Sequence, residues 1–179
     1  MKIAHIGLCV NTYTDDWGYQ ENYLPRYHKR SGNEVIIVTT PFIFNVQTQK
    51  RQFFKTGVYL DTYGVKVHRL PLLFTQRSKI ASKLRKFKGL YQVLTKEHPD
   101  IIFIHGCQFL DISEIIKYIK KNANLRVYVD NHADFSNSAS NWLSKYILHR
   151  LLWRFCAQKI EPYTTKFYGV LPARVDFLA

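Results

Sequence analysis

The sequence of 179 residues predicts an α/β fold built on a mostly parallel central sheet. Short apolar runs with the length of buried strands recur along the chain. Segments with apolar residues at helical spacing separate them. Strands that alternate with helices are typical of a parallel sheet covered by helices. Because the length suits one hydrophobic core, we expect residues 1–179 to form a single domain.

The first half of the chain is expected to hold four strands, one helix and one long loop. The first strand and the second are almost wholly apolar, which indicates burial on both faces. Asp15 and Asp16 are candidate N-caps for the helix between these two strands. Pro25 predicts a kink in this helix, and a Ser-Gly-Asn sequence ends it. The expected ranges are strand 2–8, helix 18–30, strand 34–40, loop 41–56, and strands 58–60 and 65–70.

The second half continues the alternation of helices and strands. A helix over 79–97 is followed by a strand at 101–104. A capping box of Asp111 and Glu114 then begins a helix with an isoleucine stripe. A strand at 125–129 and a polar loop at 131–141 come next, and a strand at 164–168 is expected near the end. An amphipathic helix between these last two is indicated by Leu143, Ile147, Leu148, Leu151, Leu152 and Phe155.

Candidate site residues come from the loops that follow the strands. In an open parallel sheet, ligands bind at the carboxyl ends of the strands, so three loops should share one edge. They are 9–18 after the first strand, 105–108 and 130–134. Gly18 would let a diphosphate approach the N-terminus of a helix, or would simply be a turn glycine. His105 and His132 stand at two of these strand ends, where an imidazole can donate to a hydroxyl or play a structural part.

Composition narrows the classes of partner. The net charge of +13 points to a polyanion: a phosphate-bearing ligand, an anionic membrane surface or a nucleic acid. The predicted helix at 79–97 carries Lys79, Lys83 and Lys86, a cationic face that would suit anionic lipid headgroups or would merely be solvated. Aromatic residues sit mostly at positions expected to face the core, so nucleic acid is the least favoured of the three partners.

Cysteine usage and the N-terminus indicate a cytoplasmic protein. Three widely spaced cysteines argue against a disulfide framework and against a zinc site. No secretory signal precedes the first strand, and no apolar stretch is long enough to cross a bilayer.

Taken in order, four segments resemble one enzyme family. They are Gly18 to Leu24, Ser31 to Thr40, Pro99 to Gly106, and Val129 to His132, with a further likeness over residues 168–178. Together they resemble the N-terminal domain of GT-B glycosyltransferases of family 4, retaining enzymes that build capsule, lipopolysaccharide and glycolipid. Each motif is loose, and the likeness rests on their order and spacing over nearly the whole chain.

The resemblance implies a Rossmann-like three-layer domain that forms one half of a GT-B fold. Gly18 would contact the donor diphosphate and His132 the donor sugar at the reaction centre, while Glu21, Asn22 and His105 would lie on the acceptor side. The substrates would be a UDP- or GDP-linked sugar and a glycan or lipid-linked hydroxyl, with no metal and no other cofactor. The enzyme would be cytoplasmic, and a peripheral position at the inner face of the membrane would agree with its lipid-linked acceptors.

Two departures from the family pattern matter. The glycine loop has one glycine where many relatives have two, and the domain that holds most of the donor lies outside these residues. The chain alone is therefore expected to be inactive. A non-catalytic module that binds an anionic ligand is the alternative, and a nucleic-acid-binding protein is a third reading that rests on charge alone.

Overall fold

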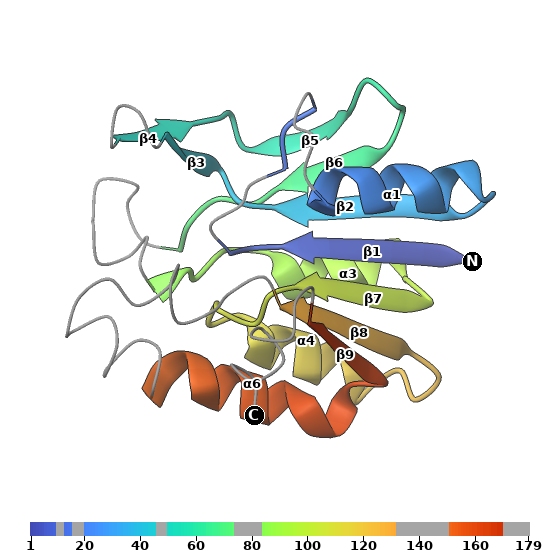
Figure 1. Ribbon diagram of the computed structural model, residues 1–179, viewed down its shortest axis with the longest axis vertical. Coiled ribbons are helices and arrows are strands. Elements are labelled where there is room, and N and C mark those ends of the chain that lie inside the picture. Colours follow the sequence, from blue (N-terminus) through green and yellow to red (C-terminus); the bar gives the residue numbers. More distant parts are fainter. Residues whose placement is uncertain (10–12, 16–19, 46–49, 74–83, 132–150, 170–179) are drawn as a thin grey trace.

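Seven strands form the central sheet of the computed structural model (Figure 1). Six of them are parallel, in the order β6-β2-β1-β7-β8-β9, and β5 pairs antiparallel to β6 at one edge. Their bounds are β1 Lys2–Gly7, β2 Glu34–Thr39, β5 Gly57–Leu60, β6 Lys66–Arg69, β7 Ile101–His105, β8 Arg126–Asn131 and β9 Lys166–Gly169. The predicted α/β fold is confirmed. The structure describes residues 1–9, 13–15, 20–45, 50–73, 84–131 and 151–169.

The order of the strands reverses direction once. From β1 the chain adds β2 and β6 on one side, and it then returns to add β7, β8 and β9 on the other side. Numbered along the chain, the six parallel strands follow the Rossmann order 3-2-1-4-5-6. The switch point of this order therefore lies between β1 and β7.

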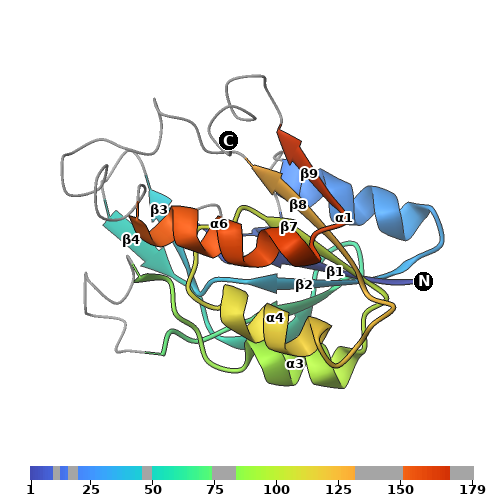
Figure 2. The same cartoon turned by 90° about the horizontal axis from the view of Figure 1, so that it is seen from below.

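Helices cover both faces of the sheet. Helix α1 (Gln20–Arg30) lies on one face, while α3 (Leu90–Glu97) and α4 (Ile112–Ile119) lie on the other (Figure 2). Helix α6 (Arg154–Ile160) lies on the same face as α3 and α4. Its Cys156 and Ile160 side chains, and that of its N-cap Trp153, pack into the core that α3 and α4 also cover. The result is a Rossmann-like three-layer arrangement.

The larger core is made by alternate residues of the central strands. On β1, Ala4 and Ile6 point to the face of α3 and α4, and their neighbours point to the opposite face. Ile102 and Ile104 of β7 join the same core. This period of two matters for the site, because it places every second residue of β1, β7 and β8 together on the α1 face.

The prediction of a long loop over 41–56 is wrong, because this segment contains a β-hairpin. Strand β3 (Phe42–Asn45) pairs antiparallel with β4 (Lys50–Phe53). Phe42 is buried, and its ring lies 5.8 Å from that of Phe53, its cross-strand partner. Such a pair of facing aromatic rings stabilises two antiparallel strands.

The continuous helix expected over 79–97 is also wrong. Helix α3 begins only at Leu90, and residues 85–89 are not helical. Phe87 instead forms an antiparallel bridge with Leu72, and Gly89 has a φ of 92°, which interrupts any helix at that point. Residues 74–83, and with them Lys79 and Lys83, lie outside the described residues.

The capping box of Asp111 and Glu114 does not form. Asp111 is the N-cap of α4, but its side chain makes no capping hydrogen bond. Its carboxylate accepts a bond from the backbone N–H of Phe87 at 2.7 Å and pairs with Lys86 at 2.8 Å. The competing partners hold the non-helical segment before α3 against the start of α4.

The apolar stripe expected on the last helix is only partly right. Leu143, Ile147 and Leu148 lie outside the described residues. Leu152 packs against the core as expected, whereas Leu151 and Phe155 are 64% and 52% exposed. The buried face also includes Trp153, Cys156 and Ile160. The wider π-helical turn at residues 151–153 shifts the angular position of the following side chains, so a stripe counted at constant helical spacing selects the wrong face.

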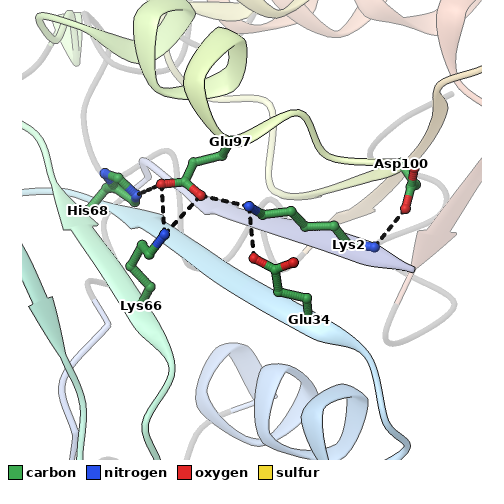
Figure 3. A network of polar contacts seen from close by, with 6 residues as sticks. All are labelled: Lys2, Glu34, Lys66, His68, Glu97 and Asp100. Atoms are coloured by element: carbon green, nitrogen blue, oxygen red, sulfur yellow. Dashed lines mark hydrogen bonds and ion pairs between the residues drawn. The ribbon is translucent and has the colours of Figure 1, made fainter.

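An ion-pair network closes the amino end of the sheet (Figure 3). The Glu97 carboxylate lies at its centre and contacts the ammonium groups of Lys2 at 2.7 Å and Lys66 at 3.1 Å. His68 bonds the same carboxylate at 3.0 Å. The network links β1, β2, β6, α3 and the start of β7 through its six members, Lys2, Glu34, Lys66, His68, Glu97 and Asp100.

Candidate functional site at the carboxyl edge of the sheet

The carboxyl ends of β1, β7 and β8 lie side by side, as predicted for the loops that follow them. The three strands are parallel neighbours, and His105 is in register with Asp130. Beyond β7, the N–H of Gly106 donates to the carbonyl of Asp130 at 2.9 Å. The switch point between β1 and β7 is where an open α/β sheet binds its ligand, so this edge is the candidate site.

Gly106 lets the first two of these strand ends approach closely. The Cys9 thiol donates to the Gly106 carbonyl at 3.3 Å. A Cβ added at Gly106 would lie 3.1 Å from the Cys9 sulfur, and the φ of 79° at this position favours glycine. The contact between β1 and β7 beyond the sheet therefore depends on the absence of a side chain.

A chain of three imidazoles and one carboxylate crosses the α1 face of the sheet. His28 Nδ1 of α1 lies 2.9 Å from His5 Nε2 of β1, and His5 Nδ1 lies 3.0 Å from His105 Nε2 of β7. His105 Nδ1 lies 2.8 Å from the Oδ2 of Asp130 on β8. The last three members are buried, with exposed fractions of 4% or less, whereas His28 is partly exposed. We call these four residues the histidine chain.

The pleat of the sheet explains this alignment. His5 and Phe103 are register partners on β1 and β7, and Phe103 and His105 are two residues apart, so all three share a face. The Phe103 ring stacks on His5 at 5.5 Å and lies 5.0 Å from His105. This apolar wall separates two of the imidazoles from solvent.

Burial keeps two of these imidazoles neutral. Desolvation lowers the pKa of His5 well below its ordinary value, and the neighbouring His105 and His28 lower it further. Desolvation, followed by the effect of His105, also lowers the pKa of His28. At neutral pH each of these two rings therefore has one N–H donor and one acceptor nitrogen.

Glu21 and Asn22 lie in the first turn of α1, next to the same edge. Both are buried, and the Asn22 amide donates to the carbonyl of Thr14 in the segment that follows β1. Burial raises the pKa of Cys9, and the charges of Asp130 and Glu21 act in the same direction. Two of the residues expected on the acceptor side are thus close to the switch point.

His105, the third residue expected there, has both ring nitrogens engaged. A ligand that contacted its imidazole would have to replace the bond to His5 or the bond to Asp130. The acceptor role of His105 stays a prediction. Gly18 and His132, expected at the donor diphosphate and the reaction centre, lie outside the described residues.

Lys86, expected to face an acceptor or a membrane, is engaged within the fold. Its ammonium pairs with Asp111, which is fully buried. Burial raises the pKa of the Asp111 carboxyl, and the hydrogen bond from Lys86 acts in the opposite direction. Much of the charge of Lys86 is therefore used to compensate a carboxylate, and its role toward an anionic surface stays a prediction.

Sequence reasoning missed a second buried cluster beside β6. The Arg69 guanidinium donates to the carbonyl of Thr40 at 2.9 Å, to the carbonyl of Tyr13 at 3.1 Å and to the hydroxyl of Tyr59 at 2.8 Å. The Tyr13 hydroxyl in turn bonds the Asp61 carboxylate. Burial, and then the bond to Asp61, raises the pKa of Tyr13. The cluster fixes the segment after β1 against β2 and β6.

The arrangement favours proton transfer over thiol chemistry. Burial raises the pKa of Cys9, of Cys107 and of Cys156, the last to about 11, so all three thiols stay protonated at neutral pH. All three are free. Within the described ranges, no group of histidine, cysteine and acidic side chains has the geometry of a metal site. In the same ranges, no helix has the length and apolar character required to span a bilayer.

No protein-family model matches the chain, and no curated protein sequence is significantly similar to it.

Proposed function

We propose that this chain is the N-terminal, acceptor-side half of a retaining GT-B glycosyltransferase. The intact enzyme would move a sugar from a UDP- or GDP-linked donor to a hydroxyl of a glycan or lipid-linked acceptor. The observation that carries the proposal is the strand order with its switch point between β1 and β7, where the start of α1 meets the ends of three parallel strands. That edge combines buried carboxylates, an amide and an imidazole, the groups that recognise the hydroxyls of a sugar.

Four of the predicted site residues have a part in this proposal. Glu21 would accept hydrogen bonds from acceptor hydroxyls, and Asn22 would hold the segment before α1 in place through Thr14. Gly18 would leave room for the donor diphosphate at the start of the helix, whose dipole favours an anion. His132 follows β8 directly in sequence and would act on the donor sugar at the reaction centre.

Binding measurements on residues 1–179 test the proposal. Saturation-transfer NMR with a panel of mono- and disaccharide glycosides should detect binding, whereas calorimetry with UDP, GDP and ADP should detect weak binding or none. No sugar transfer is expected from this chain alone. Glu21→Gln should weaken saccharide binding by about tenfold, because a hydrogen bond to a charged group contributes about 1.5 kcal/mol or more. Glu161→Gln, at an exposed position of another edge, is the matched control.

The other outcomes separate the alternatives. Tight binding of a nucleotide without any saccharide binding would favour the non-catalytic module for an anionic ligand. Binding of generic DNA or RNA that falls steeply with salt would favour the nucleic-acid reading. Measured sugar transfer by residues 1–179 alone would contradict the proposal that the donor half lies elsewhere.

A further inference from the structure

The histidine chain has one possible direction of hydrogen bonding when Asp130 is ionised. A carboxylate only accepts, so His105 donates from Nδ1 and leaves Nε2 as an acceptor. His5 must then donate from Nδ1 to His105 and accept at Nε2 from Nδ1 of His28. All three rings carry their proton on Nδ1, and the sole ring nitrogen of the chain left outside its bonds is Nε2 of His28.

The opposite direction is equally complete when Asp130 is protonated. Asp130 then donates to His105 Nδ1, His105 Nε2 donates to His5 Nδ1, and His5 Nε2 donates to His28 Nδ1. Each ring carries its proton on Nε2. The same heavy atoms and the same three bonds therefore serve two proton arrangements, and each arrangement makes all three bonds.

We propose that His28, His5, His105 and Asp130 form a proton relay between the surface of α1 and the carboxyl edge of the sheet. The relay is a property of the described residues, and it does not rest on the proposed function. It delivers a proton to Asp130, or removes one from it, without exposing this buried side chain to water.

The transfer balances as a sequence of three shifts. A solvent proton binds Nε2 of His28, whose Nδ1 proton passes to Nε2 of His5. The Nδ1 proton of His5 passes to Nε2 of His105, and the Nδ1 proton of His105 passes to the Asp130 carboxylate. One proton enters, one O–H bond forms, and every imidazole ends neutral with its proton moved from Nδ1 to Nε2.

The surroundings of the chain favour passage of the proton over its retention. The imidazolium of His5 is disfavoured by burial and by the two neighbouring rings, so a proton is not held at the middle of the chain. The Phe103 ring covers His5 and His105 and contributes no polar group that could trap it. The charges that act on the pKa of His5 come from within the chain itself, from His105 and His28.

Imidazole nitrogen NMR of the ¹⁵N-histidine-labelled full chain over a pH titration tests the relay. Its seven histidines are assigned by single substitutions. At the alkaline end, His28, His5 and His105 should all be Nδ1–H tautomers. As the pH falls, the three rings should invert to Nε2–H together at one shared midpoint, because coupled sites titrate as a unit. Separate midpoints, fixed tautomers across the range, or an imidazolium at His5 would overturn the proposal.

A substitution and its control test whether the proton enters the histidine chain at His28. His28→Gln removes the entry ring, and the inversion of His5 and His105 should be lost. His98→Asn is the matched control, because His98 is exposed, has a left-handed φ of 47° that asparagine tolerates, and lies outside the histidine chain. Inversion that persists in His28→Gln would overturn the assignment of His28 as the entry. The wild-type titration decides whether a relay exists even if this variant does not fold.

Discussion

Replacement of Glu97 by glutamine tests whether the ion-pair network in Figure 3 stabilises the amino end of the sheet. The substitution keeps the size of the side chain and removes its charge. Desolvation raises the pKa of the buried Glu97 carboxyl, but the hydrogen bonds from Lys2 and Lys66 outweigh it and lower the pKa to about 2. The ionised form is therefore favoured by the fold.

The magnitude follows from this difference in pKa. A fall from the ordinary value of 4.5 to about 2 corresponds to about 3.5 kcal/mol, at about 1.4 kcal/mol for each unit of pKa. The side chain of Lys66 is 40% exposed, so solvent screens part of this attraction. We expect Glu97→Gln to lower the free energy of unfolding at pH 7 by about 2 kcal/mol.

The direction of the pKa shift determines how the stabilisation by Glu97 changes with pH. Because the folded-state pKa is depressed, the stabilisation is present above pH 4.5 and is lost as the pH falls toward about 2. Urea denaturation of both proteins, in steps from pH 7 to pH 3, should show a constant difference in the free energy of unfolding down to about pH 4.5. Below that pH the difference should shrink. Glu34→Gln is the control. Glu34 is 62% exposed, and among the described residues its carboxylate pairs only with Lys2, so this substitution should cost less than about 1 kcal/mol. A difference between Glu97→Gln and wild type that stays constant with pH would refute the reasoning.

Two further predictions concern Gly106 and the three cysteine thiols. Gly106→Ala should lower the free energy of unfolding by more than Gly32→Ala in urea denaturation: both positions have a φ near 80°, which costs an alanine about 1–2 kcal/mol, but only the new methyl at 106 would meet the Cys9 sulfur. Equal costs would mean that the close approach to Cys9 is unimportant. Because burial raises the pKa of all three thiols, native protein at pH 7 should react with iodoacetamide far more slowly than urea-unfolded protein, and a Cys9 that reacted at the unfolded rate would contradict this.

The fold could be predicted because its signals are local. An apolar run such as the one in β1 needs no partner to be recognised as a strand, and the alternation with helices then selects a parallel sheet. The elements that were missed depend on distant partners. Phe87 pairs with Leu72 and is not part of the expected helix, and the Asp111 side chain binds the Phe87 N–H and Lys86 although Asp111 remains the N-cap of α4.

The site was predictable to the extent that strand ends define it. His105 was selected because it ends a buried strand, and its partner Asp130 lies in a loop selected by the same rule. His5 and His28 were missed, because neither stands at a strand end. One signal was present: a histidine in the middle of an apolar strand must find hydrogen-bonding partners when it is buried. Identifying those partners requires the register between β1 and β7, which no local pattern supplies.

The buried polar row that the histidine chain forms on the α1 face is itself an argument for function. On the other face of the same strands, Ala4, Ile6, Ile102 and Ile104 pack into an apolar core. A histidine at position 5 buries less apolar surface than an aliphatic side chain would. Its ring nitrogens must also be hydrogen-bonded, and the chain of bonds that does this uses two further imidazoles and a carboxylate. Replacing buried polar networks by apolar side chains is often neutral or stabilising, so stability alone does not explain one. Sites that depart from the pattern of the surrounding fold in this way are expected where function constrains the sequence, and here that departure lies beside the switch point of the sheet.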